Sequence, residues 1–171
     1  MATVWGVAPK ESIGAEVRRA GRSAVAARCV AVFEGRELDE PFLFVLAGPA
    51  SRPVLEGMAG GLDGYWPRVW ALRGLRYAWD DLAARLVIDA TADDSWRVRE
   101  MAAKVIGAHE VDDGLEALSR LAEDPVPRVR KAATSARAVL ARAGVRTGVP
   151  GPGVRPGVVV ERSESALSRR P

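Results

Sequence analysis

Two segments near the middle of the chain share one pattern, in which apolar side chains recur every three or four positions. The first segment has its apolar residues at Val98, Met101, Ala102, Val105 and Ile106. The second segment keeps nearly the same rhythm, with Val129, Ala132, Ala133, Ala136 and Leu140. An α-helix with one buried face has this period, so both segments are predicted to be amphipathic helices.

The two segments are also copies of each other in sequence. Arg97-Val98-Arg99 recurs as Arg128-Val129-Arg130, and each triplet is followed at the same offset by an apolar pair. A weaker copy places the pair Arg68-Val69 about 30 residues upstream. The shorter apolar segments Leu82–Ala90 and Leu115–Leu121 also have helical spacing, so the repeating unit is predicted to be a helix A, an acidic turn and a helix B.

The ends of these helices are predicted from residues that commonly cap helices. Asp94 has the side chain of an N-cap, and Pro125 or Pro127 suits a first helical turn. Gly107 and Gly144 are expected to end the two B helices, because glycine often follows the last helical turn.

The region upstream of the repeats also has helical patterns. Ser12–Glu34 is predicted to be one long alanine-rich helix that ends at Gly35. Leu38–Leu46 is predicted to be a short helix with acidic residues and a proline in its first turn, and Gly48–Gly61 a loop around one short helix. No alternating β-branched segment precedes the last part of the chain, so the fold class is predicted to be all-α.

The best two copies share an acidic turn residue that precedes a Val-Arg pair and two small apolar residues. The turn residues are Asp93 and Asp124, and the pairs are Val98-Arg99 and Val129-Arg130. This pattern resembles a HEAT repeat, although the period is shorter than the usual ~40 to 47 residues and is similar to a compact subtype found in phycobilin lyase-type repeat proteins.

The resemblance implies a short right-handed α-solenoid of paired antiparallel helices. The predicted repeat domain is residues 10–143, with its clearest repeats at 63–79, 80–109 and 110–142. The resemblance covers residues 63–142 well and residues 10–62 only by helix pairing, so it stays open whether the latter are true repeats or a cap. Residues 1–9 are then an N-terminal extension. Glycine, proline and arginine dominate residues 144–171, so this stretch is predicted to be a disordered tail.

Composition places the chain among ordinary globular proteins, with 48% hydrophobic and 27% charged residues in a length of 171. Its one cysteine, Cys29, excludes a disulfide framework and a cysteine-built zinc site. No apolar run approaches the ~18 residues of a spanning helix and no signal peptide is evident, so a soluble cytoplasmic protein is expected. Arginine outnumbers lysine 22 to 3, which is typical of a GC-rich, bacterial-like genome.

Charge alternates between the two helices of each unit, with basic B segments and acidic A segments. Two interpretations stay open, an internal ion-pair ladder and a basic face for an acidic partner. The resemblance implies the ladder for four residues, namely Asp93, Arg99, Asp124 and Arg130. The face that would contact a partner comprises the candidates Trp70, Arg73, Arg76, Lys104, Lys131 and Arg137.

Signals for catalysis are weak. His109 is the only histidine, and Cys29 sits in an apolar stretch without a histidine nearby. The acidic pairs, such as Asp112-Asp113, lack the spacing of a calcium loop and suit helix N-termini. No catalytic, cofactor-binding or metal-binding residue is therefore assigned, and the protein is expected to be no enzyme and to need no cofactor.

The tryptophans leave a second function open. Trp66, Trp70, Trp79 and Trp96 lie close together in the sequence, and the simplest role for such residues is packing between helices. HEAT-like alkylpurine DNA glycosylases use aromatic residues and an acid to hold a cationic base, and Trp96 lies beside two aspartates. The predicted function is a scaffold or adaptor that binds a protein partner on the helix B face. The alternative is a nucleic-acid-binding module, and the sequence leaves the oligomeric state open.

Overall fold

The computed structural model describes residues 7–147, and every regular element within that range is a helix. The α-helices are α1 (Pro9–Ala20), α2 (Arg22–Phe33), α3 (Glu40–Ala47), α4 (Ser51–Leu55), α5 (Tyr65–Tyr77), α6 (Ala84–Asp89), α7 (Trp96–His109), α8 (Leu115–Leu121) and α9 (Pro127–Thr147). Five short 3-10 helices join them: η1 (Gly48–Ala50), η2 (Met58–Asp63), η3 (Asp81–Ala83), η4 (Ala90–Ala92) and η5 (Asp112–Gly114). The all-α class is confirmed, and most of the predicted tail lies outside the described residues.

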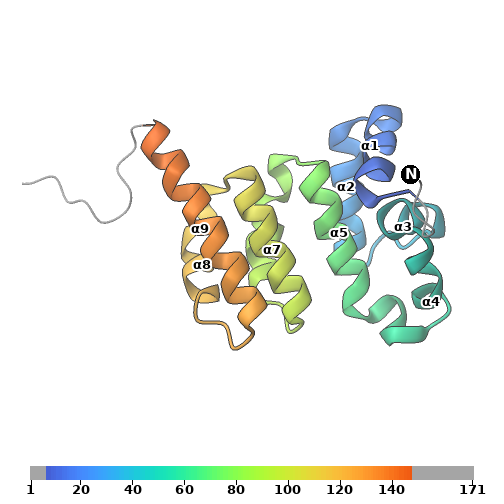
Figure 1. Ribbon diagram of the computed structural model, residues 1–171. Helices are drawn as coiled ribbons and strands as arrows, with labels where there is room; N and C mark the ends of the chain where they lie inside the picture. The colour runs from blue at the N-terminus through green and yellow to red at the C-terminus, as the bar shows by residue number, and fades with distance from the viewer. Residues whose placement is uncertain (1–6, 148–171) are drawn as a thin grey trace, which may run out of the picture.

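The helices form the layers of a short solenoid. Figure 1 shows α5, α7 and α9 side by side and roughly parallel, with each packed on the next along the row. Behind this row, α6 packs on α7 and α8 packs on α9, so each of these two layers is a short helix A and a long helix B. The row of α5, α7 and α9 is the predicted helix B face.

The N-terminal region differs from the single long helix predicted for Ser12–Glu34, because α1 and α2 are separate helices. Gly21 lies between them at φ 90° and ψ 151°, a backbone conformation that a helix cannot contain and that glycine adopts without strain. The break lets α1 turn back so that it packs on both α2 and α3. The alanine-rich stripe continues across the break, so the periodicity alone did not reveal it.

One arginine joins the three helices of this region. The Arg28 guanidinium on α2 donates to Glu37 at 2.5 Å and to Asp39 at 2.8 Å, and lies 3.5 Å from Glu16 on α1. Asp39 also caps α3, because its carboxylate accepts the backbone N–H of Phe42 at 3.0 Å. This cluster holds the N-terminal helices together, and they pack on α5, where they cover the first end of the row.

The predicted ends of the B helices are also corrected. Ser95, not Asp94, is the residue before α7, and it is the Asp93 carboxylate that accepts a backbone N–H, that of Ser95. α7 continues past Gly107 to His109 and ends with Glu110 in the left-handed conformation. α9 likewise continues past Gly144 to Thr147.

Gly107 has a packing role instead of a capping role. A Cβ atom at this position would lie 2.8 Å from the Cβ of Ala136, closer than such atoms approach each other. Glycine on α7 and alanine on α9 therefore allow these two helices to pack closely.

Candidate functional site

A ladder of ion pairs runs along the turns that precede the B helices. Arg68 on α5 donates from Nε and Nη2 to both carboxylate oxygens of Asp93, at 2.8 and 3.2 Å. One layer on, Arg99 on α7 holds Asp124 in the same way, at 2.7 and 3.2 Å. Each arginine thus grips the aspartate of the next layer with two parallel hydrogen bonds.

The same arginines also tie down the turns of their own layers. Arg99 Nη1 donates to the carbonyl oxygens of Asp93 and Asp94, and Arg130 Nη1 donates to those of Asp124 and Pro125, at 2.7–3.1 Å. The structure therefore brings together all four predicted ladder residues, although Arg130 holds only its own turn. These bonds give the carbonyl groups of each turn a hydrogen-bond donor.

Arg68 is a ladder residue that the sequence comparison missed because its copy was placed in the wrong register. The weak copy was matched through Arg68-Val69 to Arg97-Val98, which makes the spacing between copies two residues too short. In the structure Arg68 is equivalent to Arg99, and the step from Arg68 to Arg99 equals the step from Arg99 to Arg130. A strictly constant period would have identified it.

The Asp124 carboxylate is the most enclosed acid of the ladder, with a side chain only 5% exposed. Burial acts to raise its pKa, but hydrogen bonds from Arg99 and from the backbone N–H of Val126 lower the pKa below its ordinary value. The pKa of Arg99 is raised, chiefly by the hydrogen bond to Asp124. Both groups are therefore charged at neutral pH, and most of their hydrogen-bonding groups are used within the molecule.

An open groove of about 610 Å³ lies between α7 and α9 on the helix B face. Small residues form its floor, because this is where the two helices approach most closely: Ala103, Gly107, Ala108, Ala132 and Ala136. Four basic side chains and one acidic side chain surround the floor, namely Arg76, Lys104, Arg128, Lys131 and Glu100. The groove is therefore apolar at its base and carries an excess of positive charge at its margin.

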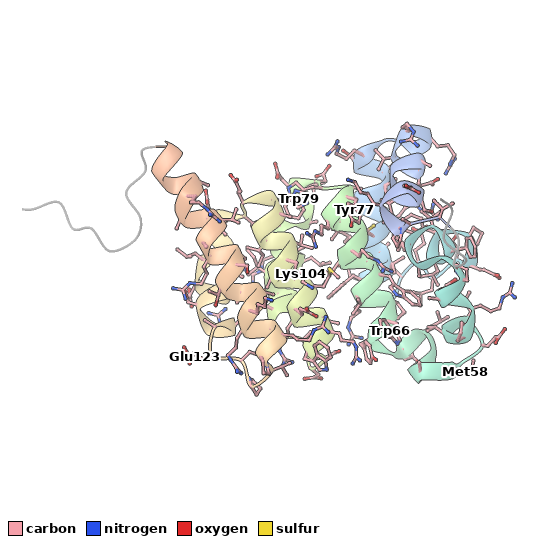
Figure 2. The ribbon with its side chains drawn as sticks, in the orientation of Figure 1. Met58, Trp66, Tyr77, Trp79, Lys104 and Glu123 are labelled. Atoms are coloured by element: carbon pink, nitrogen blue, oxygen red, sulfur yellow. The ribbon has the colours of Figure 1, made fainter. Side chains whose placement is uncertain are left out.

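The charges around the groove are only partly compensated. Glu100 accepts from Lys104 at 2.8 Å and from Arg128 at 3.4 Å, so one carboxylate serves two cations. The exposed side chains of Arg76 and Lys131 have no ion-pair partner among residues 7–147. Figure 2 labels Lys104 on α7, in the middle of the helix row.

Three of the six predicted contact residues, Arg76, Lys104 and Lys131, line this groove, whereas the other three do not. Trp70 is 3% exposed and stacks on Trp66, so it is a core residue, contrary to the prediction of a surface contact. Arg73 is also turned inward: Nη2 donates to the carbonyl of Leu46 and burial lowers its pKa. Arg137 is exposed on α9 but lies outside the groove.

A second set of residues, not predicted from the sequence, lies at the first turns of the B helices. Arg97 lies over three aromatic rings, at 4.4 Å from the ring centre of Trp96, 5.3 Å from Tyr65 and 5.6 Å from Trp66. Arg128 lies 5.5 Å from the Trp96 ring. We call these five residues the edge stripe; Figure 2 shows its member Trp66 near the lower end of α5.

The two residues best suited to chemistry have structural roles. Cys29 is fully buried, and burial raises the pKa of its thiol to about 12. The His109 ring stacks on Trp79 with centres 4.6 Å apart, and its Nε2 lies at hydrogen-bond distance from the carbonyl of Arg76. Burial is the main reason that the pKa of His109 is lowered. Within the described part of the chain, no cluster of three His, Cys, Asp or Glu side chains could hold a metal ion.

Comparison with known proteins agrees with this arrangement. Residues 63–138, from the turn before α5 into α9, match the family model of HEAT repeats. No curated protein and no solved structure matches the chain significantly. Across residues 7–147, none of the helices has both the length and the apolar character needed to cross a membrane.

Proposed function

We propose, from the match of residues 63–138 to the family model of HEAT repeats, that the protein is a non-catalytic scaffold. The ligand is an acidic segment of a partner protein, and it binds in the groove between α7 and α9. HEAT repeats often mediate protein interactions. The observation that carries the proposal is the groove itself, in which four cations and only one carboxylate surround a floor of small residues.

The charge of the groove supports an acidic ligand. Arg76 and Lys131 have no carboxylate partner within the described residues, so a bound acidic side chain meets cations without displacing an existing ion pair. The small floor residues leave room for apolar side chains of the ligand, whose burial adds the hydrophobic part of the binding energy.

The fixed geometry of the layers supports a scaffold. Arg68 and Arg99 hold successive layers through bidentate ion pairs, so the helices that form the groove stay in place when a ligand arrives. A preorganised surface loses little conformational entropy when a ligand binds. The roles of Cys29 and His109 in packing support a non-catalytic function.

The test is quantitative affinity capture with the full chain and two matched double variants. Arg76→Glu with Lys131→Glu reverses the two unpaired groove cations, and Arg137→Glu with Arg142→Glu makes the same charge change outside the groove. We expect the first variant to lose specific partners that the second retains, with unchanged helical circular dichroism in both. Equal loss in both variants would show that net charge alone, and not the groove, governs binding.

The alternative function, nucleic-acid binding, is favoured by one observation, the interleaving of Arg97 and Arg128 with aromatic rings at the edge stripe. It requires binding of labelled duplex or single-stranded DNA that weakens steeply as salt rises. A glycosylase of the HEAT-like kind also needs a free acid near Trp96. Of the two aspartates before Trp96, Asp93 does not offer one, because Arg68 and the Ser95 N–H occupy its carboxylate, whereas Asp94 is exposed.

A further inference from the structure

The edge stripe has a regular register, with one position in each layer. Trp66, Arg97 and Arg128 are equally spaced along the chain, and each is the second residue of its B helix. The first residue of each B helix accompanies it, and these are Tyr65, Trp96 and Pro127. The stripe therefore crosses all three layers in a line, along the edge where α5, α7 and α9 begin (Figure 1).

Arg97 is held in place by rings instead of by an acid. Its guanidinium lies over Trp96, Tyr65 and Trp66, and its N–H groups have no acceptor among residues 7–147. Stacking fixes the plane of a guanidinium while its edge stays free to donate. Arg97 is thus preorganised to bind a carboxylate that comes from outside the molecule.

Arg128 offers a similar donor one layer away. Its side chain is 68% exposed, its two contacts with Glu100 are both as long as 3.4 Å, and its guanidinium also lies near the Trp96 ring. Arg128 is a member of the edge stripe and also lines the groove between α7 and α9. The stripe and the groove therefore form one continuous surface.

We propose that the edge stripe binds an extended protein segment that carries two acidic side chains three residues apart. The inference rests on the proposed function, because it defines the partner of the same surface. Packed helices lie about 8 to 10 Å apart, which sets the separation of Arg97 and Arg128. A segment in the extended polyproline-II conformation has three residues per turn and rises about 3.1 Å per residue, so carboxylates three residues apart lie on the same face and match that separation.

The next layer defines one more position of the ligand. Trp66 takes the place of the arginine there and stacks on the buried Trp70, with ring centres 6.0 Å apart. A flat, half-exposed ring suits an apolar or proline side chain of the ligand. The ligand therefore carries an apolar residue, then an acidic residue three positions away, then a second acidic residue after three more.

The surroundings of the stripe favour a protein over a nucleic acid. Exposed acids stand just before each B helix, at Asp63, Asp94 and Glu123. A nucleic-acid strand on the stripe carries a negative charge at every nucleotide and is repelled by these carboxylates in each layer. A peptide with two well-placed carboxylates meets Arg97 and Arg128 and needs no charge in between.

The test uses fluorescein-labelled synthetic peptides with the full chain, followed by anisotropy at physiological salt. The spaced peptides carry leucine, glutamate and glutamate at intervals of three in a Gly/Ser background, written in both chain directions. The control peptides have the same composition with the two glutamates adjacent. We expect one spaced peptide to bind at least about tenfold more tightly than its control. Equal affinities, or no binding at about 1 mM, would overturn the inference.

Variants locate the binding on the surface. Arg97→Ala and Arg128→Ala are each expected to weaken the spaced peptide about fivefold, whereas Arg137→Ala, an exposed arginine on the same helix as Arg128, leaves it unchanged. Arg97→Lys keeps the charge but loses the planar guanidinium that lies over the aromatic rings, so it should weaken binding as well. Circular dichroism and a thermal melt confirm that each variant is folded.

The failure of this inference is separable from the failure of the proposed function. If Arg76→Glu with Lys131→Glu abolishes peptide binding and Arg97→Ala does not, the groove is the binding site and the stripe is not. If Arg97→Ala abolishes peptide binding and the groove variant still captures every partner, the stripe binds protein and the groove proposal is wrong. DNA that competes with the peptide in an Arg97-dependent manner overturns the choice of a protein ligand.

Discussion

Replacing Asp124 with alanine removes the most enclosed acceptor of the ladder. The wild-type carboxylate accepts two hydrogen bonds from Arg99 and one from the backbone N–H of Val126. Its side chain is 5% exposed and that of Arg99 is 16% exposed, so water replaces these bonds poorly. The variant leaves a largely buried guanidinium without its counter-charge.

The expected cost follows from this geometry. Removing one partner of a buried ion pair typically costs about 3 to 5 kcal/mol of unfolding free energy. Arg99 keeps two carbonyl acceptors, those of Asp93 and Asp94, so we expect Asp124→Ala to cost about 3 kcal/mol. Asp124→Asn retains an oxygen that can accept the Val126 N–H and should cost less.

The assay is urea unfolding of the full chain, followed by circular dichroism at neutral pH. The matched control is Asp89→Ala, which breaks the exposed pair with Arg85 and should cost no more than about 0.5 kcal/mol. A cost for Asp124→Ala within about 0.5 kcal/mol of that control would refute the reasoning, because the ladder would then contribute no more than a surface pair. A double-mutant cycle with Arg99→Ala isolates the energy of the pair itself.

The lowered pKa of Asp124 also predicts that the unfolding free energy decreases at acid pH. Its pKa is lower in the folded state than its unfolded value of about 3.9. At pH values above about 4 the stabilisation is fully present, and as the pH falls below this value the unfolded chain binds the proton first. The difference in stability between the wild type and Asp124→Asn should therefore shrink between pH 5 and pH 3, and a constant difference would contradict the assignment.

Three further predictions concern single positions. Gly107→Ala should cost about 1 to 3 kcal/mol in urea unfolding, because its Cβ collides with Ala136. The control Gly14→Ala, in a helix with room for a Cβ, should be neutral or slightly stabilising. Gly21→Ala should cost about 1 kcal/mol, because φ is 90° there although space is free. Native Cys29 should resist alkylation at pH 8 and react once urea unfolds the chain, because its thiol is buried and its pKa is about 12; rapid native labelling would disprove the burial.

The fold was largely predictable, because the buried residues recur at helical spacing and at the same positions in each repeat. Val98 and Val129 are both fully buried, and the pattern around them predicted the B helices and the resemblance to HEAT repeats, whose family model matches residues 63–138. Helix ends were less predictable. Gly107 and Gly144 look like stop signals in the sequence, but Gly107 is retained inside α7 because Ala136 lies against it.

The candidate site was only partly predictable, because exposure at a given helical position depends on neighbours that are distant in sequence. Trp70 and Arg73 look like surface residues of a basic helix, yet the N-terminal helices cover that side of α5 and bury them. The groove needs the juxtaposition of α7 and α9, which brings Lys104 close to Lys131. The charge of these residues was visible in the sequence, whereas their grouping was not.

The constant repeat period separates arginines that hold the fold from arginines that are free to bind. Arg99 and Arg130, like Arg68, take the position whose side chain forms hydrogen bonds with the turns. Their guanidinium groups are therefore engaged within the molecule. Arg97 and Arg128 stand two residues earlier on the same helices, and no carboxylate in the described part of the chain lies closer to them than 3.4 Å. A helix advances about 200° over two residues, so the side chains of the two sets project in nearly opposite directions. Basic content alone therefore says little about binding in such a repeat, and the position within the period decides which arginines are available to a partner.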